Sequence, residues 1–135
     1  MTTHLLDTSI YSERLKPRPS PGVVQRWSQM GDQALATSAI CEAELLFGLE
    51  RRNSERLWLE YRNYLENRIR LLSIDKAVAG VFGKLKSELE RKGRPRADFD
   101  LLVAATALSN HLILVTANDR HFKDIPGLKI ENWTK

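Results

Sequence analysis

Short apolar segments alternate along this chain with longer segments that have the character of helices. The clearest strand is the segment 112–116, which is short and almost continuously apolar. Further strands are predicted at residues 3–7, 34–37, 69–74 and 128–131. Parallel strands that alternate with helices are joined by crossover connections, so the pattern predicts an α/β fold built around a parallel sheet.

The segments between the predicted strands carry the signals of helix starts. Helices are predicted at about residues 9–14, 21–30, 38–52, 54–68, 76–92 and 98–110, with a helical turn near residues 119–123. Thr8 or Ser9 is expected to cap the first helix, and Ser38 the third. The helix that begins at Asp98 or Asp100 is apolar nearly all round, which predicts that it is deeply buried.

Length and composition restrict the class of protein. A chain of 135 residues with 42% hydrophobic and 28% charged residues fits one domain, so we expect residues 1–135 to form a single unit. No apolar run approaches the ~18 residues of a membrane span, and the first residues lack the pattern of a signal peptide. With Cys41 as the single cysteine, we expect a cytoplasmic protein without membrane association. The net charge of +4 is compatible with nucleic-acid binding.

Carboxylates interrupt or border core segments at four places: Asp7, Glu44, Asp100 and the pair Asn118-Asp119. Asp7 and Asn118-Asp119 follow predicted strands, so they should lie at the carboxyl edge of the sheet, where open α/β sheets carry their sites. Glu44 shares a helix face with apolar residues, and Asp100 has to reach the edge from the side. Carboxylates in one pocket repel each other, and a divalent cation removes this penalty. The pattern therefore indicates a metal site and phosphate chemistry.

Each of these residues also has a purely structural interpretation. Asp7 and the Asn118-Asp119 pair are typical of turns. Asp100 is typical of a helix cap, and Glu44 can lie at the margin of an apolar stripe. Any one of these acids alone is therefore weak support for a site, and the case depends on all of them lying together.

A basic loop precedes the acid at position 100. Arg94 and Arg96 either lie in a solvated loop after the preceding helix or form a phosphate-binding rim beside the metal, and we favour the rim. His121 is interpreted as a surface residue close to the site. No glycine-rich phosphate loop and no nucleophile–base motif is present.

Four segments resemble the motifs of the PIN domain, and in particular of the VapC toxins of VapBC type II toxin–antitoxin systems. Residues 5–9 are similar to the opening Leu-Asp-Thr-Asn/Ser of the family, and residues 38–48 resemble the helix that carries its second acid. Residues 93–105 resemble the third motif, and residues 115–122 the last. The resemblance covers nearly the whole chain and implies a three-layer α/β/α fold with a central parallel sheet.

The resemblance also implies roles for the acids. Asp7, Glu44 and Asp100 match the metal ligands of a Mg²⁺- or Mn²⁺-dependent endoribonuclease. Asn118 occupies a family position that is Asp or Asn, and Asp119 lies one residue later, so both are included in the expected catalytic set. The expected substrate is RNA, and several members of the family cut initiator tRNA.

Substrate contacts and partners complete the expectations, and the partners follow from the same resemblance. Thr8, Thr116, Arg94 and Arg96 are expected to contact the substrate. A cognate VapB-like antitoxin should occupy the active-site groove, operator DNA should be bound only through that antitoxin, and the toxin should be a homodimer. Two alternatives are a catalytically inactive PIN-like module that acts through an antitoxin–operator DNA complex, and a metal-dependent phosphatase or DNA nuclease on the same scaffold.

Overall fold

A five-stranded parallel sheet forms the centre of the computed structural model, which describes residues 1–135. The strands are β1 (His4–Leu6), β2 (Leu35–Ser38), β3 (Arg70–Leu72), β4 (Ile113–Val115) and β5 (Ile130–Glu131). Their order across the sheet is β3-β2-β1-β4-β5, and every neighbouring pair is parallel. β1 lies in the middle, with Leu6 in register with Thr37 and Val115. The expected α/β class is confirmed.

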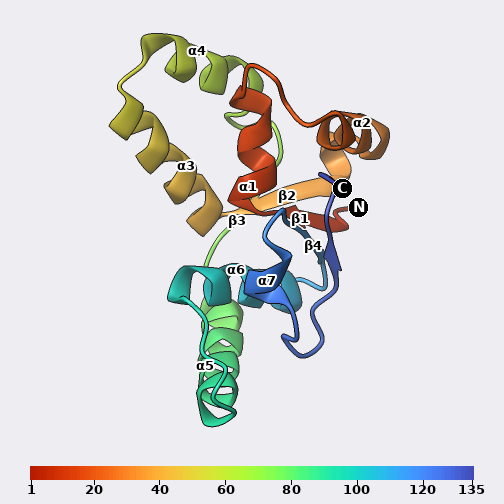
Figure 1. Cartoon of the computed structure of the whole chain (residues 1–135), viewed down its shortest axis with the longest axis vertical. Helices are drawn as coiled ribbons and strands as arrows, with labels where there is room; N and C mark the ends of the chain where they lie inside the picture. The colour runs from red at the N-terminus through yellow and green to blue at the C-terminus, as the bar shows by residue number, and fades with distance from the viewer.

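Helices cover both faces of this sheet. They are α1 (Thr8–Tyr11), α2 (Pro21–Met30), α3 (Ala39–Arg52), α4 (Glu55–Tyr64), α5 (Lys76–Arg91), α6 (Asp98–Ser109) and α7 (Asp119–Phe122), with 3₁₀ turns η1 (Ser12–Leu15) and η2 (Asp32–Ala34). Helices α1 to α4 lie on one side of the sheet, and α5 to α7 on the other (Figure 1). Leu5 belongs to a buried cluster with residues of α5 and α6, and Leu6 to a second cluster with residues of α1 to α4. Neighbouring side chains of β1 thus enter different cores, as in a three-layer α/β/α fold.

Helix ends show where the predicted boundaries were wrong. The helix expected over residues 54–68 ends at Tyr64, because the amides of Leu65 and Glu66 both donate to the carbonyl of Tyr61, at 2.9 and 2.8 Å. Asn67 then adopts a φ of 59°, in the left-handed region. The turn replaces the last helical turn, and Leu65 and Ile69 on either side of it are both buried.

Helix starts position the acids that the sequence singled out. Asp7, and not Thr8 or Ser9, caps α1, since its carboxylate accepts the amide of Thr8. Ser38 caps α3 as predicted, accepting the amide of Cys41 at 3.0 Å. Ala97 precedes α6 without a side-chain cap. Asp7 and the first residues of α3 and α6 therefore lie at or beside the carboxyl edge of the sheet.

The remaining expectations about burial hold. Helix α6 is buried over most of its length, with Leu101, Val103, Ala104 and Ala105 at most 1% exposed. Phe122 of α7 is completely buried in the same cluster. Among all the helices, none combines the length and the apolar character needed to traverse a lipid bilayer.

Candidate metal centre

Asp7 is the most firmly held of the candidate ligands. Its backbone amide continues the sheet by donating to the carbonyl of Val115 at 2.9 Å. Its Oδ1 accepts the amide of Thr8 at 2.8 Å, and its Oδ2 accepts the hydroxyl of Thr116 at 2.8 Å and that of Ser9 at 3.4 Å. The residue is only 7% exposed. The carboxylate therefore has a fixed direction at the end of the central strand.

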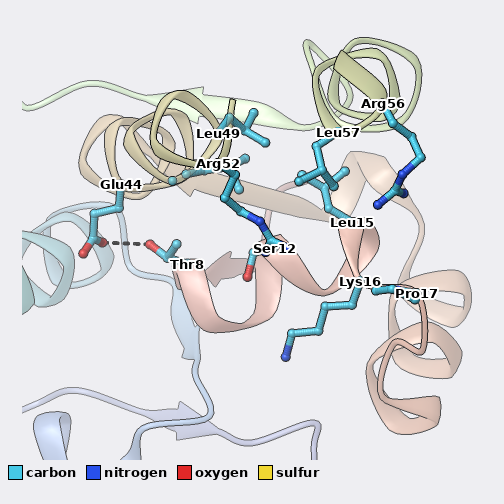
Figure 2. A pocket seen from close by; sticks show the side chains of 12 residues that line it. Thr8, Ser12, Leu15, Lys16, Pro17, Glu44, Leu49, Arg52, Arg56 and Leu57 are labelled. Atoms are coloured by element: carbon cyan, nitrogen blue, oxygen red, sulfur yellow. Dashed lines mark hydrogen bonds between the residues drawn. The ribbon is translucent and has the colours of Figure 1, made fainter. Parts of the chain in front are cut away.

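Glu44 approaches Asp7 from the second turn of α3. Single oxygen atoms of Asp7 and Glu44 and the sulfur of Cys41 all lie within 4.8 Å of one another. Glu44 Oε1 accepts the hydroxyl of Thr8 at 2.8 Å, a contact drawn in Figure 2. Burial raises the pKa of Glu44, and the neighbouring charges of Asp7 and Asp100 raise it further. The half-buried carboxylate thus lies in an environment that is already negative.

Asp100 completes the group from the opposite helical layer. It lies in the first turn of α6, and its side chain is 27% exposed. Burial raises the pKa of Asp100 and Asp7 adds to the shift, whereas His121 and Arg96 oppose it. The nearest basic side chain is His121, whose Nδ1 is 3.4 Å from Asp100 Oδ2. Asp7, Glu44 and Asp100, from three separate elements, are thus close enough for their charges to act on one another, although only Asp7 and Glu44 have ligand atoms within 4.8 Å of each other.

The donor set fits a hard divalent cation. Carboxylate oxygens are the ligands that Mg²⁺ and Mn²⁺ prefer, and a cation offsets the mutual repulsion that raises the pKa values of Glu44 and Asp100. Cys41 does not alter this preference. Burial raises the pKa of its thiol to about 11, so at neutral pH it stays protonated and points its sulfur at Asp7 Oδ1, 3.8 Å away.

The structure does not bring Asp119 to the other acids. Its two carboxylate oxygens are engaged by the amide of Asn132 at 2.9 Å and by the ammonium of Lys135 at 3.0 Å. Hydrogen bonds from these two residues hold the pKa of Asp119 below its ordinary value. Asn118 is exposed at the start of α7, and its backbone amide donates to the hydroxyl of Thr116 at 3.0 Å. A catalytic role for Asn118 stays a prediction, and the expected role of Asp119 gains no support from its contacts.

The expected substrate contacts fall into two groups. Thr116 is completely buried and its hydroxyl donates to Asp7, so it positions a candidate ligand and cannot reach a substrate. The hydroxyl of Thr8 likewise holds Glu44. Arg96 donates to the carbonyl of Lys123 at 2.9 Å, which fixes its guanidinium near Asp100, whereas Arg94 is exposed in the loop before α6. The arginines stay predicted substrate contacts.

Sequence reasoning missed two residues of the centre. Ser9 accepts the amide of Ala117 at 3.0 Å while its hydroxyl faces Asp7 at 3.4 Å, so it ties α1 to the segment after β4. Its position two residues after Asp7 was the available signal. Cys41 lies one helical turn before Glu44 on α3, and that spacing places both side chains on one face of the helix.

A groove of about 310 Å³ leads away from the acids. Thr8 and Glu44 lie at one end of it, and Lys16, Arg52 and Arg56 along its sides, between η1 and the helices α3 and α4 (Figure 2). Its apolar lining residues are Leu15, Leu45, Leu49 and Leu57. The three cations come from separate segments, so no local sequence pattern marked them.

Comparison with known proteins connects this site to a family. The model of the PIN domain matches residues 4–128. The tRNA(fMet)-specific endonuclease VapC of Shigella flexneri is 33% identical over 134 residues, which cover 99% of this chain and 100% of the relative. Ribonuclease VapC2 of Haemophilus influenzae (strain ATCC 51907 / DSM 11121 / KW20 / Rd) is 34% identical, over 98% of this chain and 99% of the relative.

A solved structure gives the same result. The crystal structure of DNA-bound VapBC from Salmonella typhimurium contains a chain that superposes with a TM-score of 0.85 and 32% identity, over 98% of this chain and 99% of that one. Fold and sequence identity agree over nearly the full length. The chain therefore belongs to the PIN-domain family and, within it, to the VapC ribonucleases.

Proposed function

We propose that this VapC-family protein is an endoribonuclease toxin that depends on a divalent metal ion, Mg²⁺ or Mn²⁺, held by Asp7, Glu44 and Asp100. The single observation that carries the proposal is the convergence of these acids from the end of β1, from α3 and from α6. Glu44 and Asp100 both have pKa values raised by burial and by the charge of Asp7, which is the electrostatic condition that a cation relieves.

Each residue of the centre has a separate role in the proposed hydrolysis. A bound divalent ion supplies positive charge against the negative charge that grows on the scissile phosphate. Asp7 keeps its direction because Thr8 and Thr116 fix both of its oxygens. Glu44 is partly open to solvent at the end of the groove, where it can orient the attacking water. Asp100 is the third proposed ligand, and it comes from α6 in the helical layer on the other face of the sheet.

The groove is the proposed path of the RNA backbone. Lys16 forms an ion pair with Glu13, and Arg56 pairs with Glu60 at 2.8 Å. Arg52 has no acidic partner, so it is the cation most available to a phosphate. The relative from Shigella flexneri carries tRNA(fMet) specificity in its name, and we propose a structured tRNA as the first substrate to test.

The proposed partner is a VapB-like antitoxin. The similar structure from Salmonella typhimurium is a DNA-bound VapBC complex, and we propose the same division here, in which the antitoxin contacts operator DNA and blocks the groove. A homodimer of the toxin remains a prediction, to be checked by light scattering of the purified protein.

The test is RNA cleavage by the purified protein with Mg²⁺, with Mn²⁺ and with EDTA. Cleavage should require the metal and should disappear in Asp7→Asn, whose amide keeps the shape of the side chain and loses its charge. Glu50→Gln is the matched control, because Glu50 is exposed on the same helix as Glu44 and should leave cleavage unchanged.

Three outcomes would contradict the proposal. Equal cleavage by wild type and Asp7→Asn would indicate a contaminating nuclease or a site elsewhere. Metal-dependent cleavage of single-stranded DNA in preference to RNA would favour the DNA nuclease alternative. Absence of any cleavage by a metal-loaded wild-type protein would leave the inactive PIN-like module as the better description, a result that the ribonuclease relatives do not favour.

A further inference from the structure

The three acids of the proposed centre are not held equally well by the protein. Asp7 accepts hydrogen bonds from Thr8 and Thr116, and Glu44 accepts one from Thr8. The carboxylate of Asp100 accepts none of the hydrogen bonds within the chain. The one basic side chain within 4.0 Å of it is His121, whereas the guanidinium of Arg96 acts on it from further away. Any fixed direction of Asp100 therefore depends on His121.

The backbone of His121 is itself firmly placed. The amide of His121 donates to the carbonyl of Asn118 at 3.0 Å, and the next residue, Phe122, is completely buried in the core cluster that includes α6. The guanidinium of Arg96 donates to the carbonyl of Lys123 at 2.9 Å and so ties the loop before α6 to the end of α7. Two contacts thus hold the start of α6, which carries Asp100, next to the turn that carries His121. They are the packing of Phe122 in the core and the hydrogen bond from Arg96.

The two side chains lie at hydrogen-bond distance but are not aligned for a hydrogen bond in this structure. His121 Nδ1 lies 3.4 Å from Asp100 Oδ2, within hydrogen-bond reach after a small rotation of the exposed ring. The imidazole is 52% exposed, so its packing adds little to the core. A hydrogen bond from Nδ1 to Oδ2 would occupy one oxygen of Asp100 and leave the other free for the metal ion.

We propose that His121 is a positioning residue that orients Asp100 for the metal by donating from Nδ1 to one carboxylate oxygen. The inference rests on the proposed metal centre. Groups that hydrogen-bond to metal ligands fix the ligand geometry, and removing them typically weakens metal binding about 10- to 100-fold. Since Asp100 has no other orienting partner, it is the ligand for which such a group should matter most.

The test compares three substitutions that place a donor differently. In His121→Asn the side-chain amide nitrogen lies near the position of Nδ1, in His121→Gln it lies near that of Nε2, and His121→Ala has no donor. Binding of Mn²⁺ to the purified protein, followed by electron paramagnetic resonance, should weaken about 10- to 100-fold in His121→Ala. Affinity should be largely restored in His121→Asn and should stay weak in His121→Gln.

A matched control tests whether the loss of any basic side chain from α7 would have the same effect. Arg120→Ala removes an exposed neighbouring charge without touching Asp100 and should leave Mn²⁺ affinity unchanged. Thermal unfolding in EDTA should be the same for all these variants, which excludes a purely structural effect.

The failure of this inference can be told apart from the failure of the proposed function. Tight Mn²⁺ binding in wild type, weak binding in Asp100→Asn and unchanged binding in His121→Ala would overturn the role of His121 alone. Equal affinities of His121→Asn and His121→Gln would also overturn it, because the position of the donor would then not matter. If wild type binds no Mn²⁺, the metal centre itself is refuted and the role of His121 with it.

Discussion

Two glutamates on α3, two residues apart, should respond in opposite ways to the same substitution. Glu42 accepts the hydroxyl of Tyr11 at 2.9 Å and that of Tyr61 at 2.7 Å, so it joins α3 to α1 and α4. Burial, together with the charge of Glu42, raises the pKa of both tyrosines, which therefore stay protonated donors. Glu44 instead faces Asp7 and Asp100. Glu42→Gln and Glu44→Gln thus remove a structural charge and a proposed metal ligand, respectively.

The magnitudes follow from these contacts. Two unit charges about 5 Å apart interact with about 3 kcal/mol at an effective dielectric constant of about 20, and exposure to solvent reduces this for Glu44 to about 1 kcal/mol. Gln at position 44 still accepts the hydroxyl of Thr8, so Glu44→Gln should raise the metal-free stability by about 1 kcal/mol. Glu42→Gln exchanges two hydrogen bonds to a charged acceptor for weaker ones and should lower stability by about 1–3 kcal/mol.

The assay is urea unfolding in EDTA, repeated with Mg²⁺, together with RNA cleavage. Glu44→Gln should be more stable than wild type without metal, lose the stabilisation by Mg²⁺, and lose cleavage. Glu42→Gln should be less stable in both conditions while keeping the metal response and the cleavage activity. Metal-free destabilisation of Glu44→Gln by several kcal/mol, with an intact response to Mg²⁺, would refute the assignment of Glu44 to the centre.

The stability of the metal-free protein should depend on pH through Glu44, in a direction that follows from the pKa of this group. The folded pKa of Glu44 is raised above its unfolded value, so its protonation favours the folded state. The stability from this group is fully present below the unfolded pKa and is lost as pH rises through the folded pKa. The advantage of Glu44→Gln over wild type in EDTA should therefore shrink as pH falls towards the ordinary pKa of a glutamate.

Further predictions concern the metal, the support of Asp7 and the packing of the C-terminal segment. Adding Mn²⁺ at about 100 times its Kd should stabilise the wild-type protein by about 2.7 kcal/mol, measured by the shift of the urea midpoint, and Asp7→Asn should show no shift. Thr116→Val removes the hydroxyl that binds Asp7 and the amide of Asn118, so it should cost about 1–3 kcal/mol and reduce cleavage; unchanged cleavage would show that Asp7 needs no such support. A Cβ on Gly22 would lie 2.1 Å from the carbonyl oxygen of Trp133, so Gly22→Ala should lower the free energy of unfolding by about 1–3 kcal/mol, and a neutral result would contradict this close approach.

The sequence was sufficient for the sheet because its signal is local. A strand of a parallel sheet is buried on both faces, so segments such as 112–116 are apolar at nearly every position and stand out between helices. The N-cap of α3 at Ser38 was equally local. The end of α4 was not, since the turn after Tyr64 is set by the burial of Leu65 and Ile69 against distant elements.

The candidate site was predictable in part for the same reason. Asp7, Glu44 and Asp100 each border a core segment, and the topology of a parallel sheet brings such positions to one edge. Asp119 has the same local signal, but its partners are Asn132 and Lys135, which lie after β5 and turn its carboxylate towards the C-terminal segment. Only the positions of side chains far apart in sequence decide between these two outcomes.

The structural and catalytic interpretations of Asp7 prove to be compatible. A carboxylate has about four lone-pair sites, and the strong hydrogen bonds from Thr8 and Thr116 use one on each oxygen. Capping α1 therefore fixes the direction of the group. The remaining site on each oxygen meets only a long contact, from Cys41 at 3.8 Å and from Ser9 at 3.4 Å, which a cation can displace. Asn at position 7 keeps an acceptor for the amide of Thr8 and loses the charge, so the cap should survive a substitution that removes the ligand. In this family member, a turn signal at the end of the central strand is thus the means by which the proposed metal ligand is held rigid, and the two interpretations need not be weighed against each other.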